Sequence, residues 1–575
     1  MASFLLGPIY PPPIGLSTSG NIESWSSGLM LSLSQVLQSG HSNFGDFEAN
    51  TSSVSITILS TEEAEDTSFF DFHYASPFLN ASAGGTAQVT KNSIYRLGSI
   101  SKLFTAYTLL VGYGWRIWDH AVTQYLPELR GAVQPGYGNS IENVYWDGVT
   151  VGALASQLSG VGRDYANGDL ASQGFPWMEA GLPELSPKDV PDCAGNSSLP
   201  PCNRQEYFQG ILQRHPVFAP WTTPVYSNAG FRLLGYVLEA LGRTTYNSLL
   251  QSKVLGPLGL ADTSATYPPN EGSWVIPGGN ESGFHVNYGD EIPTAGIYSS
   301  SDNLARFGRS ILLNKQLSAL DTRRWMKPTS HTSSRFFSVG SPWEIWRTQS
   351  QITSGRVIDL YTKSGSVGQY NSQLMLLPDY GVTLSILVAG PSSGAVITIA
   401  TETVLQSLIP VLEKVTIGQA CDNICGTYES AQPGTNSSIT VAADAVGLYL
   451  DRWINQGVDI KAVAQAYAAQ TGSAPIRSAR LQATNLVDAH AAPANHTAAE
   501  ENRRVAYRVV FDTTAEEDPK GPPRILKPDA CQWGKTDSIM YGEIGIDDFV
   551  VHLQANGTAV MIEPRVVRDT LWRTG

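Results

Sequence analysis

Alternation of apolar and polar residues predicts strands at two places in the chain. Residues 53–62 alternate in this way, and residues 69–76 form a second such segment after a polar interval, so the two predict a hairpin. Three more strand-like segments lie within 357–390, and the turn at 378–381 separates the last two. These segments predict the strands of one mixed unit, together with the helices described next.

Apolar residues at helical spacing predict the accompanying helices. After Ser99, apolar side chains recur at Leu103, Phe104, Tyr107 and Leu110, the spacing of one helix face. Further helices are predicted over 149–160, 227–242 and 395–415, and the glycine at the end of the second is a typical helix terminator.

The character of the chain divides it into three parts. Residues 1–49 are interpreted as an N-terminal extension and 50–415 as a catalytic domain, while 416–575 consist of short strand-like segments between turns, which predicts an all-β domain. Within the catalytic part, 163–224 is long, rich in Pro and Gly, and aromatic. A loop of that length inside a domain is usually functional or mobile.

Composition and charge exclude some partner classes. The 575 residues carry a formal charge of −14, from 37 basic and 51 acidic side chains, and no basic cluster stands out, so no nucleic-acid partner is expected. No stretch approaches the roughly 20 apolar residues of a membrane span. The sequence leaves the oligomeric state open.

Cysteines and glycosylation sequons favour the secretory pathway, although the start of the chain has no intact signal peptide. Cys193 and Cys202 bracket a loop and could close a small disulfide, while Cys421, Cys425 and Cys531 leave one odd thiol. The alternative is a cytoplasmic enzyme with reduced cysteines. Seven Asn-X-Ser/Thr sequons would make the chain a glycoprotein: Asn50, Asn80, Asn196, Asn280, Asn436, Asn495 and Asn556.

A serine and a lysine three residues apart open the apolar helix that follows Ser99. On a helix, Ser99 and Lys102 share a face, so the amine could reach the hydroxyl, while the positive helix end and burial would both favour an uncharged amine. The alternative is that Ser99 caps the helix and Lys102 reaches out to water. From this pair alone, the cap is favoured.

Two later motifs change that balance. The triplet Tyr226–Asn228 lies on a loop that leads into an apolar helix, which can fix a phenol and an amide toward a cleft, and similar triplets occur at 137–139 and 165–167. The single Lys-Ser-Gly triplet, 363–365, lies on a strand-like segment, and its glycine would let a substrate lie flat against the strand edge.

One rival nucleophile must be weighed. Residues 390–394 fit Gly-x-Ser-x-Gly with Ser392 between a strand and a helix, which is typical of a nucleophile elbow. The histidines that follow it, His490, His496 and His552, all lie in the β-rich region, so we interpret the segment as a strand-to-helix turn. The nine histidines are scattered, and we expect neither a metal nor a cofactor.

The three motifs, in this order, resemble those of the serine β-lactamase and penicillin-binding protein superfamily, in particular the branch of class C β-lactamases and fungal β-lactamase-related esterases and acyltransferases. Flanking stretches at 118–129, 149–161, 254–263 and 294–312 are also similar, so the resemblance covers roughly 50–415. It implies an α/β fold, an antiparallel sheet flanked by helices with a helical lobe. Residues 416–575 are similar only to the β-rich extensions of some members.

The resemblance implies roles for eight residues. Ser99 would attack an acyl carbonyl, Lys102 would take its proton, and Tyr226 would protonate the leaving group and then activate the next nucleophile. Lys363 would hold Tyr226 in the right ionisation state. Asn228 would bind the acyl side chain and help to place Lys102. Ser364 and Gly365 would contact the substrate at the strand edge, and the backbone N–H groups of Ser99 and Ser366 would form the oxyanion hole.

Departures from the family pattern narrow the expected activity. Ser364 stands where many members have threonine, the stretch 149–161 lacks a His-Thr-Ser run, and 163–224 is an insertion that would reshape the cleft. We therefore expect a serine hydrolase or acyltransferase that forms an acyl-enzyme with a small-molecule ester, thioester or amide, esters first. The alternatives are a DD-peptidase or β-lactamase, and a binding protein of the same fold without turnover.

Overall fold

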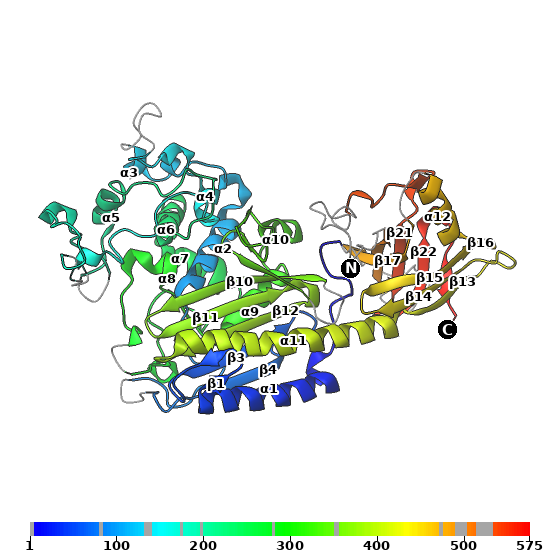
Figure 1. Ribbon diagram of the computed structural model, residues 1–575, viewed down its shortest axis with the longest axis horizontal. Coiled ribbons are helices and arrows are strands. Elements are labelled where there is room, and N and C mark those ends of the chain that lie inside the picture. Colours follow the sequence, from blue (N-terminus) through cyan, green and yellow to red (C-terminus); the bar gives the residue numbers. More distant parts are fainter. Residues whose placement is uncertain are drawn as a thin grey trace.

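The structure is a computed structural model. It describes residues 5–574 except 80–83, 131–140, 173–175, 177, 196–198, 279–281, 350–355, 471–474, 489–502 and 513–532. Two bodies lie side by side, a larger mixed domain and a smaller β-rich domain, and one long helix runs from the first to the second (Figure 1).

The larger domain is built on an eight-stranded antiparallel sheet in the order β4-β3-β12-β11-β10-β9-β8-β7. The predicted hairpin and the three later strands are confirmed, and β12 pairs with β3 to join them in one sheet. The strands are β3 (Ser53–Ser60), β4 (Ser68–Tyr74), β7 (Ser330–His331), β8 (Phe337–Val339), β9 (Glu344–Gln349), β10 (Val357–Val367), β11 (Tyr370–Leu377) and β12 (Val382–Ala389).

Helices cover both faces of this sheet, so its central strands are buried on both sides. One face carries the core of the helical lobe and the other packs against α1 and α11 (Figure 1). The helices are α1 (Gly20–Ser39), α2 (Ser101–Tyr113), α3 (Pro127–Arg130), α4 (Val151–Ala155), α5 (Arg204–Ile211), α6 (Asn228–Gly242), α7 (Tyr246–Leu250), α8 (Ile292–Ala295), α9 (Ser301–Leu312), α10 (Ala319–Trp325) and α11 (Ser393–Ile424). The antiparallel sheet with a helical lobe confirms the expected fold class.

Two helices differ from their predicted extents. The helix predicted over 149–160 spans only Val151–Ala155, because the chain leaves the helical conformation at Ser156 and Gln157 has a positive φ of 64°. The helix predicted over 395–415 continues to Ile424. α11 is long and apolar enough in composition to cross a membrane, but here it packs along the sheet and places side chains in the core.

The smaller domain has a nine-stranded sheet around its own core, accompanied by α12 (Ile460–Gln470), which occupies the alanine-rich stretch. The strands are β13 (Gly426–Ser430), β14 (Ser438–Asp444), β15 (Gly447–Asn455), β16 (Val458–Asp459), β17 (Ser478–Asp488), β18 (Arg503–Asp512), β21 (Asp548–Leu553), β22 (Ala559–Pro564) and β23 (Leu571–Arg573).

Two helices pack across the boundaries predicted at 49 and 415. α1 belongs to the catalytic core, where Leu29, Leu33 and Leu37 pack against the sheet. α11 crosses the other boundary and contributes Ala420 and Ile424 to the core of the β-rich domain. Periodicity alone hid α1 because serine and glutamine interrupt its apolar face.

The packing of α1 generates a prediction about stability. Leu33 is 2% exposed against the sheet, whereas Leu31 on the same helix is 60% exposed. We expect Leu33→Ala to lower the free energy of unfolding by about 2–5 kcal/mol, because it leaves a cavity, and Leu31→Ala to change it by less than about 0.5 kcal/mol. Denaturant unfolding measures both. Equal effects would mean that α1 is an extension rather than part of the core.

Candidate active site

Ser99 lies at the junction of a short 3-10 helix, Gly98–Ile100, and α2. Neither helix start receives a hydrogen bond from a capping side chain, so the alternative of Ser99 as a helix cap is not seen. Gly98 has a φ of 55°, and a Cβ there would come within 2.7 Å of the backbone nitrogen of Ser366. Glycine therefore allows the nucleophile's turn to lie directly against β10.

Lys102 is buried rather than extended to water. Its Nζ lies 3.0 Å from Ser99 Oγ and donates to the carbonyl oxygen of Thr294 at 2.9 Å, and the side chain is fully buried. Burial lowers the pKa of Lys102 and outweighs Tyr226, which raises it, while the positive charge of Lys363 lowers it further. Among the described residues, no carboxylate forms an ion pair with this amine. The arrangement favours an uncharged amine able to accept the proton of Ser99.

The Tyr226 ring lies between the two lysines. Lys102 Nζ is 4.9 Å and Lys363 Nζ 5.3 Å from the ring centroid. Burial alone would raise the pKa of the phenol, but the charges of Lys363 and Lys102, with hydrogen bonds to Ser99 and Lys102, outweigh it and lower the pKa to about 8. The loop is fixed behind Tyr226 because Ser227 caps α6 by accepting from Gly230 N.

Glu344 is a site residue that the motifs did not reveal. Its carboxylate accepts from Lys363 Nζ at 2.5 Å and from both the backbone nitrogen and the hydroxyl of Ser364, at 2.9 and 2.8 Å. Burial alone would lower the pKa of Lys363, but Glu344 outweighs it and raises the pKa. Lys363 is therefore held charged beside Tyr226. A charged residue on a short strand before the Lys-Ser-Gly triplet gave no recognisable signal.

Gly365 lies where β10 approaches the backbone of the nucleophile. A Cβ at this position would come within 1.9 Å of Leu97 O and 2.9 Å of Ser99 N, so the glycine lets β10 approach the nucleophile's backbone. The same approach brings Ser366 N against Gly98. The two backbone N–H groups assigned to an oxyanion hole thus lie at one junction, next to Ser99 Oγ.

Asn228, the first residue of α6, is tied to an acidic partner. Its Nδ2 donates to Asp164 Oδ2 at 3.0 Å. Burial, followed by the charge of Glu291, raises the pKa of Asp164 to about 6. The described hydrogen bonds do not join Asn228 to Lys102, whose second partner is Thr294. Asp164 lies at the start of the insertion, and no motif had marked it.

A cleft of about 330 Å³ opens beside Tyr226 and Lys363. Its lining comes from β8, β9, the segments next to them, the end of the insertion and the residue Gln157 after α4. These residues carry hydroxyl, apolar, amide and carboxylate side chains: Gln157, Thr223, Pro224, Thr332, Ser333, Phe337, Val339, Pro342 and Glu344. The insertion thus contributes to the cleft wall. A larger groove of about 630 Å³ lies between α11 and the opposite face of the sheet, and it contains none of the motif residues.

The alternatives from the sequence fall outside this cluster. Ser392 lies in the turn before α11, and no histidine contacts its hydroxyl within the described residues. Tyr165 packs edge-on against Tyr207, and residues 137–139 lie outside the described part of the chain. The described residues contain no group of three or more His, Cys, Asp or Glu placed to hold a metal ion.

Both halves of the chain match families of known proteins. The beta-lactamase family model matches residues 69–406, and a family described as a beta-lactamase-like C-terminal domain matches 416–575. A beta-lactamase-like protein of Arthroderma benhamiae is 30% identical over 79% of this chain and 74% of its own length. A probable hydrolase of Phoma sp. is 25% identical over 77% and 72%, respectively.

Solved structures also align with part of the chain. A class C beta-lactamase of 18% sequence identity aligns with 67% of this chain and 96% of its own, with a TM-score of 0.46. The extent of the family match and the 30% identical relative settle the assignment. The chain belongs to the beta-lactamase family, and so to the serine β-lactamase and penicillin-binding protein superfamily.

Proposed function

We propose that this protein is a serine hydrolase or acyltransferase that forms an acyl-enzyme on Ser99, with uncharged esters as its first substrates. The observation that carries the proposal is the contact between Ser99 Oγ and the buried amine of Lys102. A buried amine whose pKa is lowered, in that position, is the base that a serine needs to become a nucleophile near neutral pH. Relatives described as probable hydrolases support the same class.

The proposed reaction has two half-reactions. Ser99 Oγ attacks the acyl carbonyl while its proton passes to Lys102, and the N–H groups of Ser99 and Ser366 hold the negative oxygen. Tyr226 gives its proton to the departing alcohol, whose bond to the acyl carbon breaks. In the second half, the Tyr226 phenolate takes a proton from water or an acceptor alcohol, which attacks the ester carbonyl on Ser99. The bond from the acyl carbon to Ser99 Oγ breaks, and Lys102 returns its proton to Ser99 Oγ.

The contacts of Glu344 favour esters over β-lactams and peptides. β-Lactam antibiotics and peptide C-termini carry a carboxylate that a site must neutralise. Here the Lys363 charge is already balanced by Glu344, and the Ser364 hydroxyl donates to the same carboxylate. A substrate carboxylate would meet Glu344 as a like charge. A DD-peptidase or β-lactamase remains the second candidate, supported by the family itself.

The disulfides support a secretory location for the protein. Cys193 pairs with Cys202 as the loop suggested, and Cys421 pairs with Cys425. Cys531 lies outside the described residues. Disulfides persist mainly in oxidising compartments, so we propose secretion or passage through the secretory pathway.

Ser99→Ala tests the chemistry. We expect wild-type protein to hydrolyse p-nitrophenyl esters and to gain one acyl mass. We expect the alanine variant to lose at least about 10³-fold in kcat, because it lacks the hydroxyl that Lys102 Nζ contacts. Chain-length series and intact mass measure both effects. Equal turnover by the variant would contradict the proposal, and mass gain without turnover would support the non-catalytic binding protein.

Lys363 sets the pH dependence of the reaction. Its charge lowers the pKa of Tyr226 and that of Lys102. We expect the wild-type rate of deacylation to rise with pH through about 8, because this half of the reaction uses the Tyr226 phenolate. Lys363→Ala should move this rise to higher pH, because both groups then hold their protons more tightly.

Lys363→Arg is the matched control, since it keeps the charge and should keep the profile near that of the wild type. Ester hydrolysis between pH 5 and 10, with thermal unfolding of each variant, separates titration from misfolding. An alanine variant that is folded, active and unshifted would contradict the assigned role of Lys363.

A further inference from the structure

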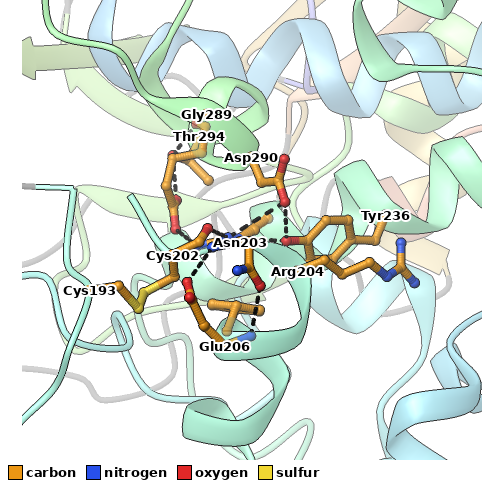
Figure 2. Close-up of polar contacts among 12 residues, drawn as sticks. Cys193, Cys202, Asn203, Arg204, Glu206, Tyr236, Gly289, Asp290 and Thr294 are labelled. Atoms are coloured by element: carbon orange, nitrogen blue, oxygen red, sulfur yellow. Dashed lines mark hydrogen bonds and ion pairs between the residues drawn. A yellow bond between two sulfur atoms is a disulfide. The ribbon is translucent and has the colours of Figure 1, made fainter. Parts of the chain in front are cut away.

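A chain of polar contacts links Lys102, through Thr294, to the region of the Cys193–Cys202 disulfide, and Figure 2 shows its part from Thr294 onward. Lys102 Nζ donates to the Thr294 carbonyl in α8. The Thr294 hydroxyl, in turn, donates to the carbonyl oxygen of Glu291 at 2.7 Å and to its carboxylate at 3.1 Å. Thr294 is 2% exposed. The position of the carbonyl that holds Lys102 is thus fixed by Glu291.

Glu291 is fixed by Arg232 of α6, which is 2% exposed. Arg232 Nη1 donates to Glu291 Oε1 at 2.8 Å, and Nη2 donates to the carbonyl oxygen of Cys202 at 2.6 Å. Its Nε donates to Tyr236, whose hydroxyl donates to Asp290 at 2.7 Å (Figure 2). Every nitrogen of the guanidinium has a partner, so its orientation is determined from three sides.

The Cys193–Cys202 disulfide closes the far end of this chain of contacts. It holds the carbonyl that accepts from Arg232 and also the neighbouring Pro201. Pro201 lies against Gly289, where an added Cβ would be 3.3 Å from the proline Cβ and where φ is 46°. The disulfide loop therefore contacts the segment just before Glu291 and also contacts Arg232, the partner of Glu291.

The desolvation cost of the Arg232–Glu291 ion pair indicates a role other than stabilising the fold. A buried ion pair such as Arg232–Glu291 seldom stabilises a fold more than apolar side chains would, because desolvation offsets the attraction. α8 has only four residues and cannot hold its own geometry. An uncharged lysine directs its lone pair at Ser99 only if its N–H is directed elsewhere, and the Thr294 carbonyl supplies that direction.

We propose that Arg232 and Glu291, clamped by the Cys193–Cys202 disulfide, are positioning residues that hold the Thr294 carbonyl against Lys102 and so set the rate of Ser99 acylation. The inference rests on the proposed function, because it assigns Lys102 the role of base. It adds a sensitivity to thiols: a dithiol would reduce the disulfide to two cysteine thiols, become oxidised to its own disulfide, and loosen the clamp.

Thr294→Val and Thr294→Ser form the first test, since valine removes only the hydroxyl and serine keeps it. Single-turnover acylation by a p-nitrophenyl ester gives the acylation rate and the substrate dissociation constant separately. We expect valine to lower the acylation rate roughly tenfold or more with the dissociation constant unchanged, and serine to retain most of the rate. A merely structural role would lower the active fraction instead, which titration with a fluorophosphonate measures.

The two disulfides supply the second test. We expect Cys193→Ser with Cys202→Ser to slow acylation several-fold, and Cys421→Ser with Cys425→Ser to leave it unchanged. Dithiothreitol should slow the wild type and the second variant but not the first. Glu291→Gln keeps the size of the side chain but removes the charge that pairs with Arg232, and it should slow acylation in the same way.

The outcomes separate this inference from the proposed function. Wild-type protein that shows no acylation burst, or a burst that survives Ser99→Ala, overturns the proposed function and this inference with it. A burst that depends on Ser99 but is unchanged by Thr294→Val, Glu291→Gln and loss of the Cys193–Cys202 disulfide overturns the inference alone.

Discussion

The site depends on the burial of the Lys102 amine, which forms an ion pair with no carboxylate in the described part of the chain. Each unit by which the pKa of Lys102 falls costs about 1.4 kcal/mol relative to a solvated lysine, and that cost must be met by the packing around it. The helical lobe and the sheet close over Lys102 from opposite sides, with the Phe231 ring 5.7 Å from its Nζ. In the proposed reaction this amine can exchange a proton with Ser99, because no carboxylate among the described residues forms an ion pair with it.

The second lysine shows how much the partner matters. Lys363 is as deeply buried as Lys102, yet its pKa is raised because Glu344 lies against it, whereas that of Lys102 is lowered. In the proposed reaction the two lysines have different roles: Lys363 keeps a positive charge, and Lys102 exchanges a proton with Ser99. Tyr226 lies within reach of both, and its lowered pKa follows from that position.

Sequence patterns predicted the parts of the fold that repeat regularly. The strands at 53–62 and 357–390 and the helix before Gly242 were found because their apolar residues keep a strict period. α1 and the end of α11 were missed because their buried faces are interrupted or pass from one domain to another. The motif residues Ser99, Lys102, Tyr226 and Lys363 could be placed together only through the family resemblance.

The residues that surround the motif side chains belong to no recognisable sequence motif. Glu344 lies where the pairing of β9 with β10 ends, and its carboxylate accepts a hydrogen bond from the backbone nitrogen of Ser364 on β10. Asp164 reaches the site from an insertion, and Thr294 through its carbonyl, which any residue carries. Their roles come from tertiary geometry, which spacing along the chain does not encode.

The most direct test of this account is the pKa of Lys102 itself. Protein labelled with carbon-13 at the lysine side chains would be titrated by nuclear magnetic resonance, and the signal that disappears in Lys102→Ala would be assigned to this residue. The account predicts that this signal titrates well below the ordinary lysine value of about 10.4, and that Lys363→Ala moves it upward. Titration at or above the ordinary value would show that the amine is charged at neutral pH, and Lys102 could not then be the base for Ser99.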